Sequence, residues 1–273
     1  MKTKKLIIGN WKMYPASVKD AKAKFTAIKK VASALRNVQT VICPPFVYAS
    51  DLKKLVTGHR VVVGAQNAWF ENEGAYTGEV SPAMIKSLGL EHVIIGHSER
   101  RAMGETDELI NKKVLAAVKA GLTVVLCVGE HERDVDGAYL KFISEQIKAA
   151  LRGVQKKDLM KVGIAYEPIW AIGKHAVHAA SPDDALEVSI LIKKTLADLY
   201  GLPATANRSK GTVWRWQAGK DGSAVLILYG GSVDAKNAWE FLMKSQIDGL
   251  LVGRASLDPK IFGEILKSAD QIK

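Results

Sequence analysis

The chain alternates short apolar runs with longer amphipathic segments, and this alternation limits its fold more than any other feature. Each run is rich in aliphatic residues and leads through a Gly- or Pro-containing loop into a helical pattern. The predicted strands are Lys5–Gly9, Gln39–Cys43, Arg60–Gly64, His92–Gly96, Thr123–Val128, Val162–Tyr166, Val225–Leu228 and Gly249–Val252, and the clearest helical patterns cover Ala16–Arg36, Glu105–Ala120, Gly137–Leu151 and Pro182–Tyr200. Strands that are apolar on both faces and alternate with helices indicate a parallel sheet covered by helices.

Eight such units in 273 residues favour a closed barrel over an open sheet. We therefore expect an α/β protein with a single (β/α)8 barrel domain spanning residues 1–273. Turn signals flank a short alternating run, Thr212–Gln217, and predict a hairpin-like insert at 204–224. Because it precedes the seventh strand, the insert is expected at the bottom of the barrel. Trp214 and Trp216 are expected to pack onto the barrel, with contact to a nucleic acid or a partner protein as the alternative.

Composition narrows the function classes without choosing among them. The net charge of +11 and the pI near 9.5 predict attraction of anions, from small phosphates to nucleic acid. Nucleic-acid binding is not expected, since lysines such as Lys19, Lys22 and Lys24 are spread along a helical pattern, as on a solvated face. No apolar run reaches membrane-spanning length, and the N-terminal run is too short for a signal peptide. Cys43 and Cys127 lie in apolar runs, which predicts buried thiols and a reducing, cytoplasmic location.

Polar residues follow several of the predicted strands, and in a barrel these positions share one mouth. The set comprises Asn10 and Lys12, His97 and Glu99, Glu167, and the turns Gly230–Gly231–Ser232 and Gly253–Arg254. Glu167 precedes Pro168, which favours extended backbone, so its side chain is expected to project where a loop begins. That position suits a catalytic base, although a surface Glu ending a strand fits the segment alone. Lys12 alone fits a surface lysine, and His97 alone fits the start of a helix capped by Ser98.

The two glycine turns follow the last two strands, where barrels of this kind bind phosphate, and could bare backbone N–H groups to it. Either turn alone fits an ordinary tight turn, and the pair is much more specific.

Other candidate chemistry is weaker. His175 and His178 lack a third ligand of clear spacing, so no metal site is expected. Neither GxxxxGK[ST] nor GxGxxG is present, and no cofactor is expected. Cys127 has no base near it in sequence, which argues against a nucleophile.

Taken together, the motifs resemble those of the triosephosphate isomerase family, in the same order and across almost the whole chain. The segments that carry the resemblance are Asn10–Met13, Gly96–Arg101, Ala165–Gly173, Tyr229–Val233 and Val252–Leu257, with Gly64–Ala68 and Tyr76–Glu79 similar to the family's long third loop. The resemblance implies a TIM barrel that interconverts dihydroxyacetone phosphate and glyceraldehyde 3-phosphate through an enediol, as a cytoplasmic enzyme of glycolysis and gluconeogenesis. It also implies catalysis without a metal or other cofactor.

The resemblance further assigns roles to single residues. Glu167 matches the base, Asn10, Lys12 and His97 match the groups that stabilise charge on the carbonyl oxygen, and Glu99 matches the residue that holds the lysine. The loop 168–180 matches a lid whose Ile172 and Gly173 backbone approaches the phosphate, which would rest on N–H groups of Ser232, Gly253 and Arg254. The loop 66–80 matches the segment that enters a second subunit, with Thr77 supporting the partner's site, and so implies a homodimer.

Three segments depart from the family pattern. The closing half of the lid, Lys174–Ala180, is longer than usual, so the resemblance does not fix the position of the second hinge. Arg254 stands where the family commonly has glycine, and 204–224 is an added segment. Two alternatives therefore stay open: a barrel enzyme acting on another phosphorylated sugar, and a binding protein that retained the fold.

Overall fold

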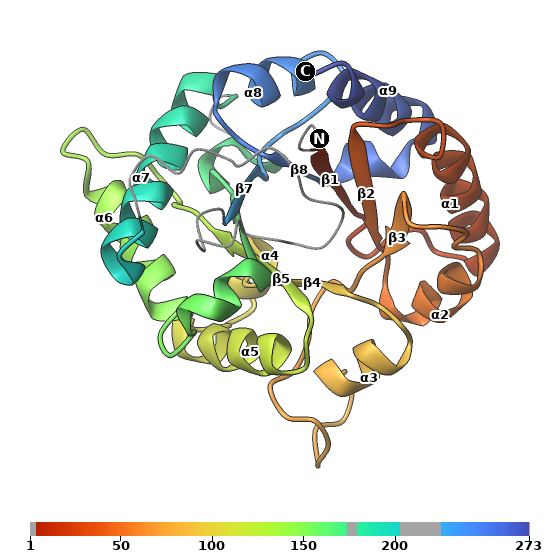
Figure 1. Cartoon of the computed structure of the whole chain (residues 1–273), viewed down its shortest axis with the longest axis horizontal. Helices are drawn as coiled ribbons and strands as arrows, with labels where there is room; N and C mark the ends of the chain where they lie inside the picture. The colour runs from red at the N-terminus through yellow and green to blue at the C-terminus, as the bar shows by residue number, and fades with distance from the viewer. Residues whose placement is uncertain (1–3, 174–178, 203–224, 273) are drawn as a thin grey trace.

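The computed structural model describes residues 4–173, 179–202 and 225–272, and in it the strands form one parallel sheet that closes into a barrel (Figure 1). The strands are β1 (Lys5–Asn10), β2 (Val38–Cys43), β3 (Val61–Val63), β4 (His92–Ile95), β5 (Thr123–Val128), β6 (Val162–Tyr166), β7 (Leu226–Tyr229) and β8 (Gly249–Val252). Their order is β3-β2-β1-β8-β7-β6-β5-β4. A parallel bridge between Ala65 and Val93 joins the two ends of this order, with the Ala65 N–H donating to the His92 carbonyl at 2.8 Å.

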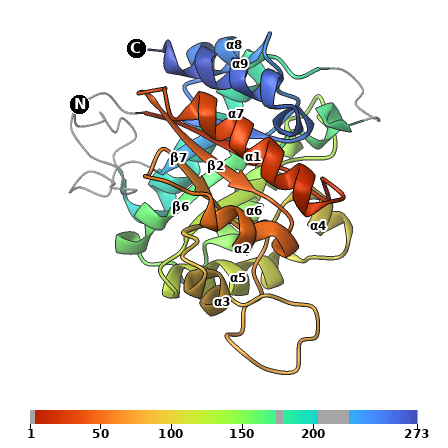
Figure 2. The same cartoon turned by 90° about the vertical axis from the view of Figure 1, so that its right-hand side faces the viewer.

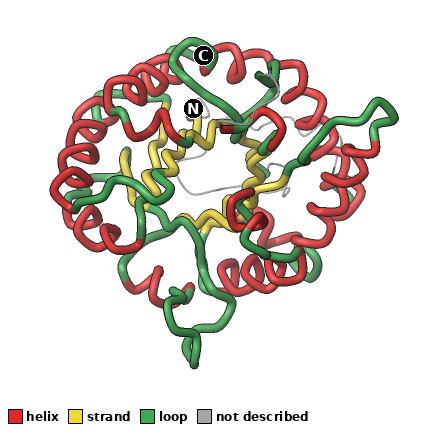
Figure 3. Tube along the Cα trace, turned by 180° about the vertical axis from the view of Figure 1, so that it is seen from behind, coloured by secondary structure: helices red, strands yellow, loops and turns green. Residues whose placement is uncertain are grey.

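Helices surround the barrel, as the alternating pattern predicts (Figure 3). They are α1 (Val18–Ala32), α2 (Phe46–Lys54), α3 (Pro82–Ser87), α4 (Ser98–Ala102), α5 (Asp107–Lys119), α6 (Ala138–Ala150), α7 (Pro182–Tyr200), α8 (Ala238–Lys244) and α9 (Pro259–Asp270), with short 3₁₀ turns η1 (Lys156–Lys161), η2 (Ile169–Ala171) and η4 (Arg254–Leu257). Local capping sets where several of them begin. Ser181 accepts the Asp184 N–H while the Asp184 carboxylate accepts the Ser181 N–H, a capping box that starts α7.

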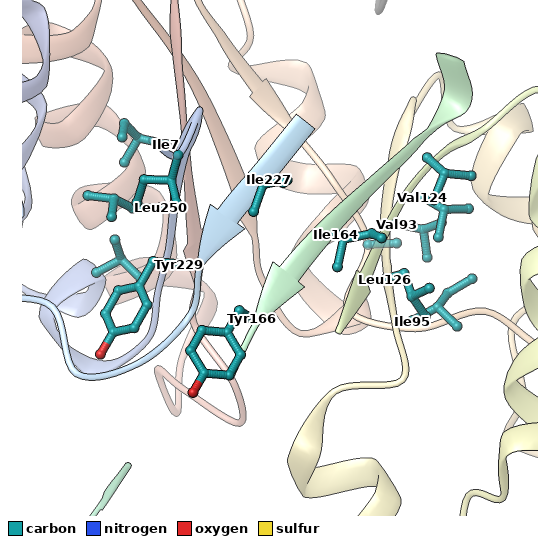
Figure 4. Packing of buried hydrophobic residues seen from close by; sticks show 14 of the residues in the cluster. Ile7, Val93, Ile95, Val124, Leu126, Ile164, Tyr166, Ile227, Tyr229 and Leu250 are labelled. Atoms are coloured by element: carbon teal, nitrogen blue, oxygen red, sulfur yellow. The ribbon is translucent and has the colours of Figure 1, made fainter. Parts of the chain in front are cut away.

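Each strand contributes to two hydrophobic clusters because successive side chains point to opposite faces. One cluster contains only strand residues, among them Ile8, Cys127 and Ala165, and therefore fills the barrel interior. The other joins the outer faces of the strands to the helices, and Figure 4 shows its strand residues, including Tyr166 and Tyr229. Continuing the interior alternation past the last strand residues brings Glu167 and Gly230 to the mouth, two positions beyond Ala165 and Leu228.

The predicted fold class is confirmed: the protein is a single (β/α)8 TIM barrel. The strand and helix bounds differ from the expected ones by a few residues at most, since apolar periodicity locates an element better than its ends. The loop between β3 and α3 projects from the barrel (Figures 1 and 2). The expected insert at 204–224 lies outside the described residues. Cys43 and Cys127 are free and buried, as predicted.

His92, the first residue of β4, makes the stability of the protein depend on pH. It lies where β4 meets the chain that follows β3. Burial, with a smaller contribution from Lys86, lowers the pKa of His92 from 6.5 to about 4. The unfolded chain therefore binds a proton first, so stability is lost as pH falls through the window from about 6.5 to about 4. We expect His92 to contribute about 2 kcal/mol to the loss of unfolding free energy between pH 7 and 4.5. Urea titrations of the wild type and His92→Gln across this range test it, and equal pH slopes would contradict it.

Candidate functional site

The mouth of the barrel begins with an unusual backbone conformation at Lys12. Asn10 ends β1 and is buried, and its Oδ1 accepts the Lys12 N–H at 3.0 Å. Lys12 has φ +52°, a left-handed conformation that costs a non-glycine residue about 1–3 kcal/mol. The Gln66 side-chain amide holds it there by donating to the Lys12 and Cys43 carbonyls at 2.8 and 2.9 Å. The strand end and the neighbouring loop thus fix the direction of the Lys12 side chain.

The Lys12 ammonium lies between the ends of β4 and β8. Its Nζ is 2.6 Å from Glu99 Oε1, an ion pair whose side chains are 27% and 49% exposed. A Cβ added at Gly253 would lie 3.4 Å from Lys12 Cε, so the ammonium stem runs directly beside that glycine. The structure therefore brings together Lys12, Glu99 and Gly253, which were selected from sequence and follow β1, β4 and β8.

His97 is held in one tautomer by the start of α4. Its Nδ1 accepts the Glu99 N–H at 3.1 Å, which makes His97, and not Ser98, the N-cap residue. A nitrogen that accepts a hydrogen bond carries no proton, so the neutral ring has its N–H at Nε2. That Nε2 lies 3.2 Å from Glu167 Oε1. Sequence placed Ser98 as the cap because serine is a common capping residue, whereas here the imidazole fills that role.

Glu167 is a buried carboxylate, 3% exposed, in the first position after β6. Its Oε2 accepts the Ser98 N–H at 2.8 Å, while Oε1 faces His97. Two glycines make room for it: a Cβ at Gly129 would lie 1.8 Å from the Glu167 carbonyl oxygen, and one at Gly230 would lie 3.0 Å from Glu167 Cγ. The base predicted from sequence therefore touches the imidazole predicted from sequence.

Cys127 lies beneath this carboxylate, inside the barrel. Burial, followed by the nearby charge of Glu167, raises the pKa of Cys127 well above its ordinary value. The thiol therefore stays protonated at neutral pH, which agrees with the expectation that it is not a nucleophile.

A polar cluster around η2 was missed in the sequence. Glu130 Oε1 accepts from the Tyr166 hydroxyl and the Trp170 indole N–H at 2.7 Å each, and from Arg133 Nε at 3.2 Å. Arg133 also donates to Asp184, which belongs to the capping box of α7. The only signal for Glu130 was its place just after a strand, which it shares with many loop residues.

The two glycine turns stand side by side at the mouth. The Ser232 hydroxyl donates to the Ala171 carbonyl at 2.8 Å and so links the β7 turn to η2. Gly253 follows β8 beside Lys12, and Arg254 begins η4 with an exposed side chain. Ile172 is partly buried, and Gly173 is exposed with φ +81° at the last described position before residue 179.

The remaining predicted residues lie elsewhere or outside the described part. Thr77 is exposed in the projecting loop 66–80, not at the mouth of its own barrel. Residues 174–178 of the expected lid, which include His175 and His178, and the expected insert lie outside the described residues. Across residues 4–173, 179–202 and 225–272, no group of three His, Cys, Asp or Glu side chains is placed to hold a metal ion. The same ranges contain no helix with the length and apolar character needed to span a membrane.

Comparison with known proteins identifies what the chain is similar to. A sequence model of the family described as triosephosphate isomerase matches residues 5–269. The triosephosphate isomerase of Thermoanaerobacter pseudethanolicus is 41% identical over 263 residues, which cover 96% of this chain and 98% of the relative. Those of Dictyoglomus turgidum and Carboxydothermus hydrogenoformans are 40% and 42% identical over 97% of this chain and 99% of each relative.

Proposed function

The chain belongs to the triosephosphate isomerase family, and on this premise we propose that it interconverts dihydroxyacetone phosphate and glyceraldehyde 3-phosphate with Glu167 as the base. The observation that carries the assignment of the base is the contact between Glu167 and the His97 Nε2 at the barrel mouth. The proton beside a carbonyl is acidic only if charge on the carbonyl oxygen is stabilised as the proton leaves. A carboxylate and an N–H donor in one site, with an ammonium nearby, meet both needs.

Glu167 changes its partners during the proposed reaction. Its oxygens are occupied by the Ser98 N–H and His97, so the carboxylate must turn toward the substrate carbon before it can take a proton. Gly230 supports this movement, since any side chain there would crowd Glu167 Cγ. The protonated acid then returns the proton to the neighbouring carbon. A second proton must pass from the hydroxyl oxygen to the former carbonyl oxygen, and the His97 N–H at Nε2 faces the position from which it can relay this proton. The two transfers together exchange the positions of carbonyl and hydroxyl.

His97 and Lys12 supply the stabilising donors. The His97 N–H at Nε2 faces the position that Glu167 leaves, so it can donate to the enediolate oxygens. Lys12 brings a positive charge that Glu99 orients, and Asn10 fixes the Lys12 backbone. These donors are in place before the substrate arrives, so the reaction does not have to reorient solvent.

The phosphate is proposed to rest against the glycine turns. Backbone N–H groups of Ser232, Gly253 and Arg254, with Gly173 and Ile172 from the lid, would bind its oxygens. The Ser232 bond to Ala171 joins the phosphate turn to the lid base, so a phosphate that binds there can favour closure. Closure of the loop 168–180 would exclude water and protect the enediolate phosphate from elimination.

The projecting loop 66–80 is proposed to enter a second subunit, with Thr77 supporting the partner's site. Residues 71–78 are exposed, and so are Met13 and Met103 beside the mouth, at 91% and 76%. A second subunit that covered these two side chains would remove apolar surface from water. Light scattering is expected to give the mass of a dimer, and a fully active monomer would contradict this assembly.

A coupled assay and a proton-exchange experiment test the proposed reaction. The enzyme should produce glyceraldehyde 3-phosphate from dihydroxyacetone phosphate and, in heavy water, incorporate deuterium at the product carbon that accepts the proton from Glu167. Turnover without deuterium incorporation would argue against an enediol route with an exchangeable carboxylic acid. Absence of both, with turnover of a different sugar phosphate, would support the alternative barrel enzyme.

A further inference from the structure

Arg254 places a positive charge at the phosphate side of the mouth. It follows Gly253, whose α-carbon faces the Lys12 stem, and its side chain is exposed. Within the described ranges, neither an ion pair nor a hydrogen bond engages its guanidinium. By contrast, Arg100, Arg101 and Arg133 are each paired with a carboxylate.

The other charged side chains at the mouth suggest what the positive charge of Arg254 does. The Lys12 ammonium is paired with Glu99, and Glu167 adds a second carboxylate close by. In the β7 turn the exposed Asp234 and Lys236 offset one another. Among these described groups, and without Arg254, three negative charges face two positive ones. The site must nevertheless accept a phosphate monoester, which is close to a dianion at neutral pH. An uncompensated negative field would slow the approach of that dianion.

We propose that the Arg254 side chain offsets this field and makes the site selective for dianionic substrates over neutral or singly charged ones. The inference rests on the proposed function and adds to it a role for the side chain, distinct from the backbone N–H of the same residue. Direct contact with phosphate is not required. At ionic strengths near the physiological value, salt screens the attraction between two charges only beyond a Debye length of about 8–10 Å. The guanidinium therefore raises the association rate and lowers KM, while the chemical step stays with Glu167 and His97.

Arg254→Gln tests the proposal, with Arg254→Lys as the charge-conserving variant. At low ionic strength we expect kcat/KM of the glutamine variant to fall about threefold to tenfold, mainly through KM. The loss should shrink below about twofold at high salt, because salt then also screens the attraction between Arg254 of the wild type and the phosphate dianion. The inhibition constant of glycerol 3-phosphate should rise in parallel, whereas Arg254→Lys should stay near the wild type.

Lys260→Gln is the matched control. Lys260 is an exposed cation in the first turn of α9, so its loss changes net charge equally without touching the mouth. It should leave kcat/KM and its salt dependence unchanged. An equal loss in both glutamine variants, or a loss in Arg254→Gln that ignores salt, would overturn the proposal.

A binding measurement separates this inference from the proposed function. Titration of inorganic phosphate into the wild type and Arg254→Gln, followed by calorimetry, needs no turnover. Weaker binding to the variant at low salt supports the role of Arg254, and equal binding refutes it. An inactive wild type that still shows the Arg254-dependent binding would overturn only the proposed reaction.

Discussion

Glu167→Gln is expected to lower kcat for both directions of the isomerisation by about 10³- to 10⁴-fold, the upper part of the range for a general base. Glutamine keeps the size of the side chain, and its amide oxygen can still accept the Ser98 N–H. It cannot take a proton from carbon, and its NH₂ group would face the His97 N–H that now points at Glu167 Oε1. The loss should therefore be in the chemical step, with a smaller change in KM.

Two readouts distinguish a lost base from a damaged fold. Deuterium incorporation from heavy water should fall with turnover, because both need the same proton transfer. The inhibition constant of glycerol 3-phosphate should stay within a few-fold of the wild type, since the glycine turns proposed to bind phosphate are untouched. Glu132→Gln, an exposed carboxylate in the loop after β5, is the control and should retain full activity. Exchange at the wild-type rate in Glu167→Gln would remove Glu167 from the mechanism.

The positions of the site residues could be predicted because barrel topology converts sequence order into place. The carboxyl ends of the strands meet at one mouth of the barrel. Asn10, His97, Glu167 and the glycine turns could therefore be grouped from the sequence alone. Their orientations could not be predicted. The left-handed backbone of Lys12 depends on Gln66, which lies far along the chain, and the tautomer of His97 depends on its unexpected role as an N-cap.

The cluster around η2 shows a second limit of sequence patterns. Glu130, Tyr166 and Trp170 are buried and share contacts with the partly exposed Arg133. In sequence they are a loop Glu, two aromatic residues in apolar surroundings and a loop Arg. Apolar periodicity locates Tyr166 on the outer face of β6 and says nothing of its hydroxyl. Buried polar groups need partners, and the partners here come from the ends of different strands.

Lys113→Met is expected to lower the unfolding free energy by about 3–5 kcal/mol, the cost of leaving a buried carboxylate without one of its cations. Lys113 lies on α5 with a fully buried side chain and pairs with Glu105, itself 5% exposed. Burial lowers the pKa of Lys113, and the hydrogen bond that Lys113 donates to Glu105 acts against that shift. Arg100 also pairs with Glu105 and should hold the loss toward the lower end of the range. Urea denaturation measures it.

Two controls test whether this loss of stability comes from the unpaired charge of Glu105. Lys119→Met makes the same substitution at an exposed position of α5 and should change stability by about 0.5 kcal/mol or less. Adding Glu105→Gln to Lys113→Met should restore part of the stability, because the unpaired charge is then gone. A double variant as unstable as the sum of the single ones would mean that the pair does not act as a unit.

The same substitution should weaken the proposed dimer. Lys113 Nζ donates to Asn67 Oδ1 at 3.1 Å and lies 5.3 Å from the Trp69 ring centroid, so one ammonium anchors the root of the loop 66–80. If that loop enters a second subunit, its loosening must raise the concentration at which dimers form. We therefore expect Lys113→Met to lose activity on dilution sooner than the wild type, with a matching shift in light scattering. Reduced stability with unchanged dissociation would show that the ion pair supports only its own barrel.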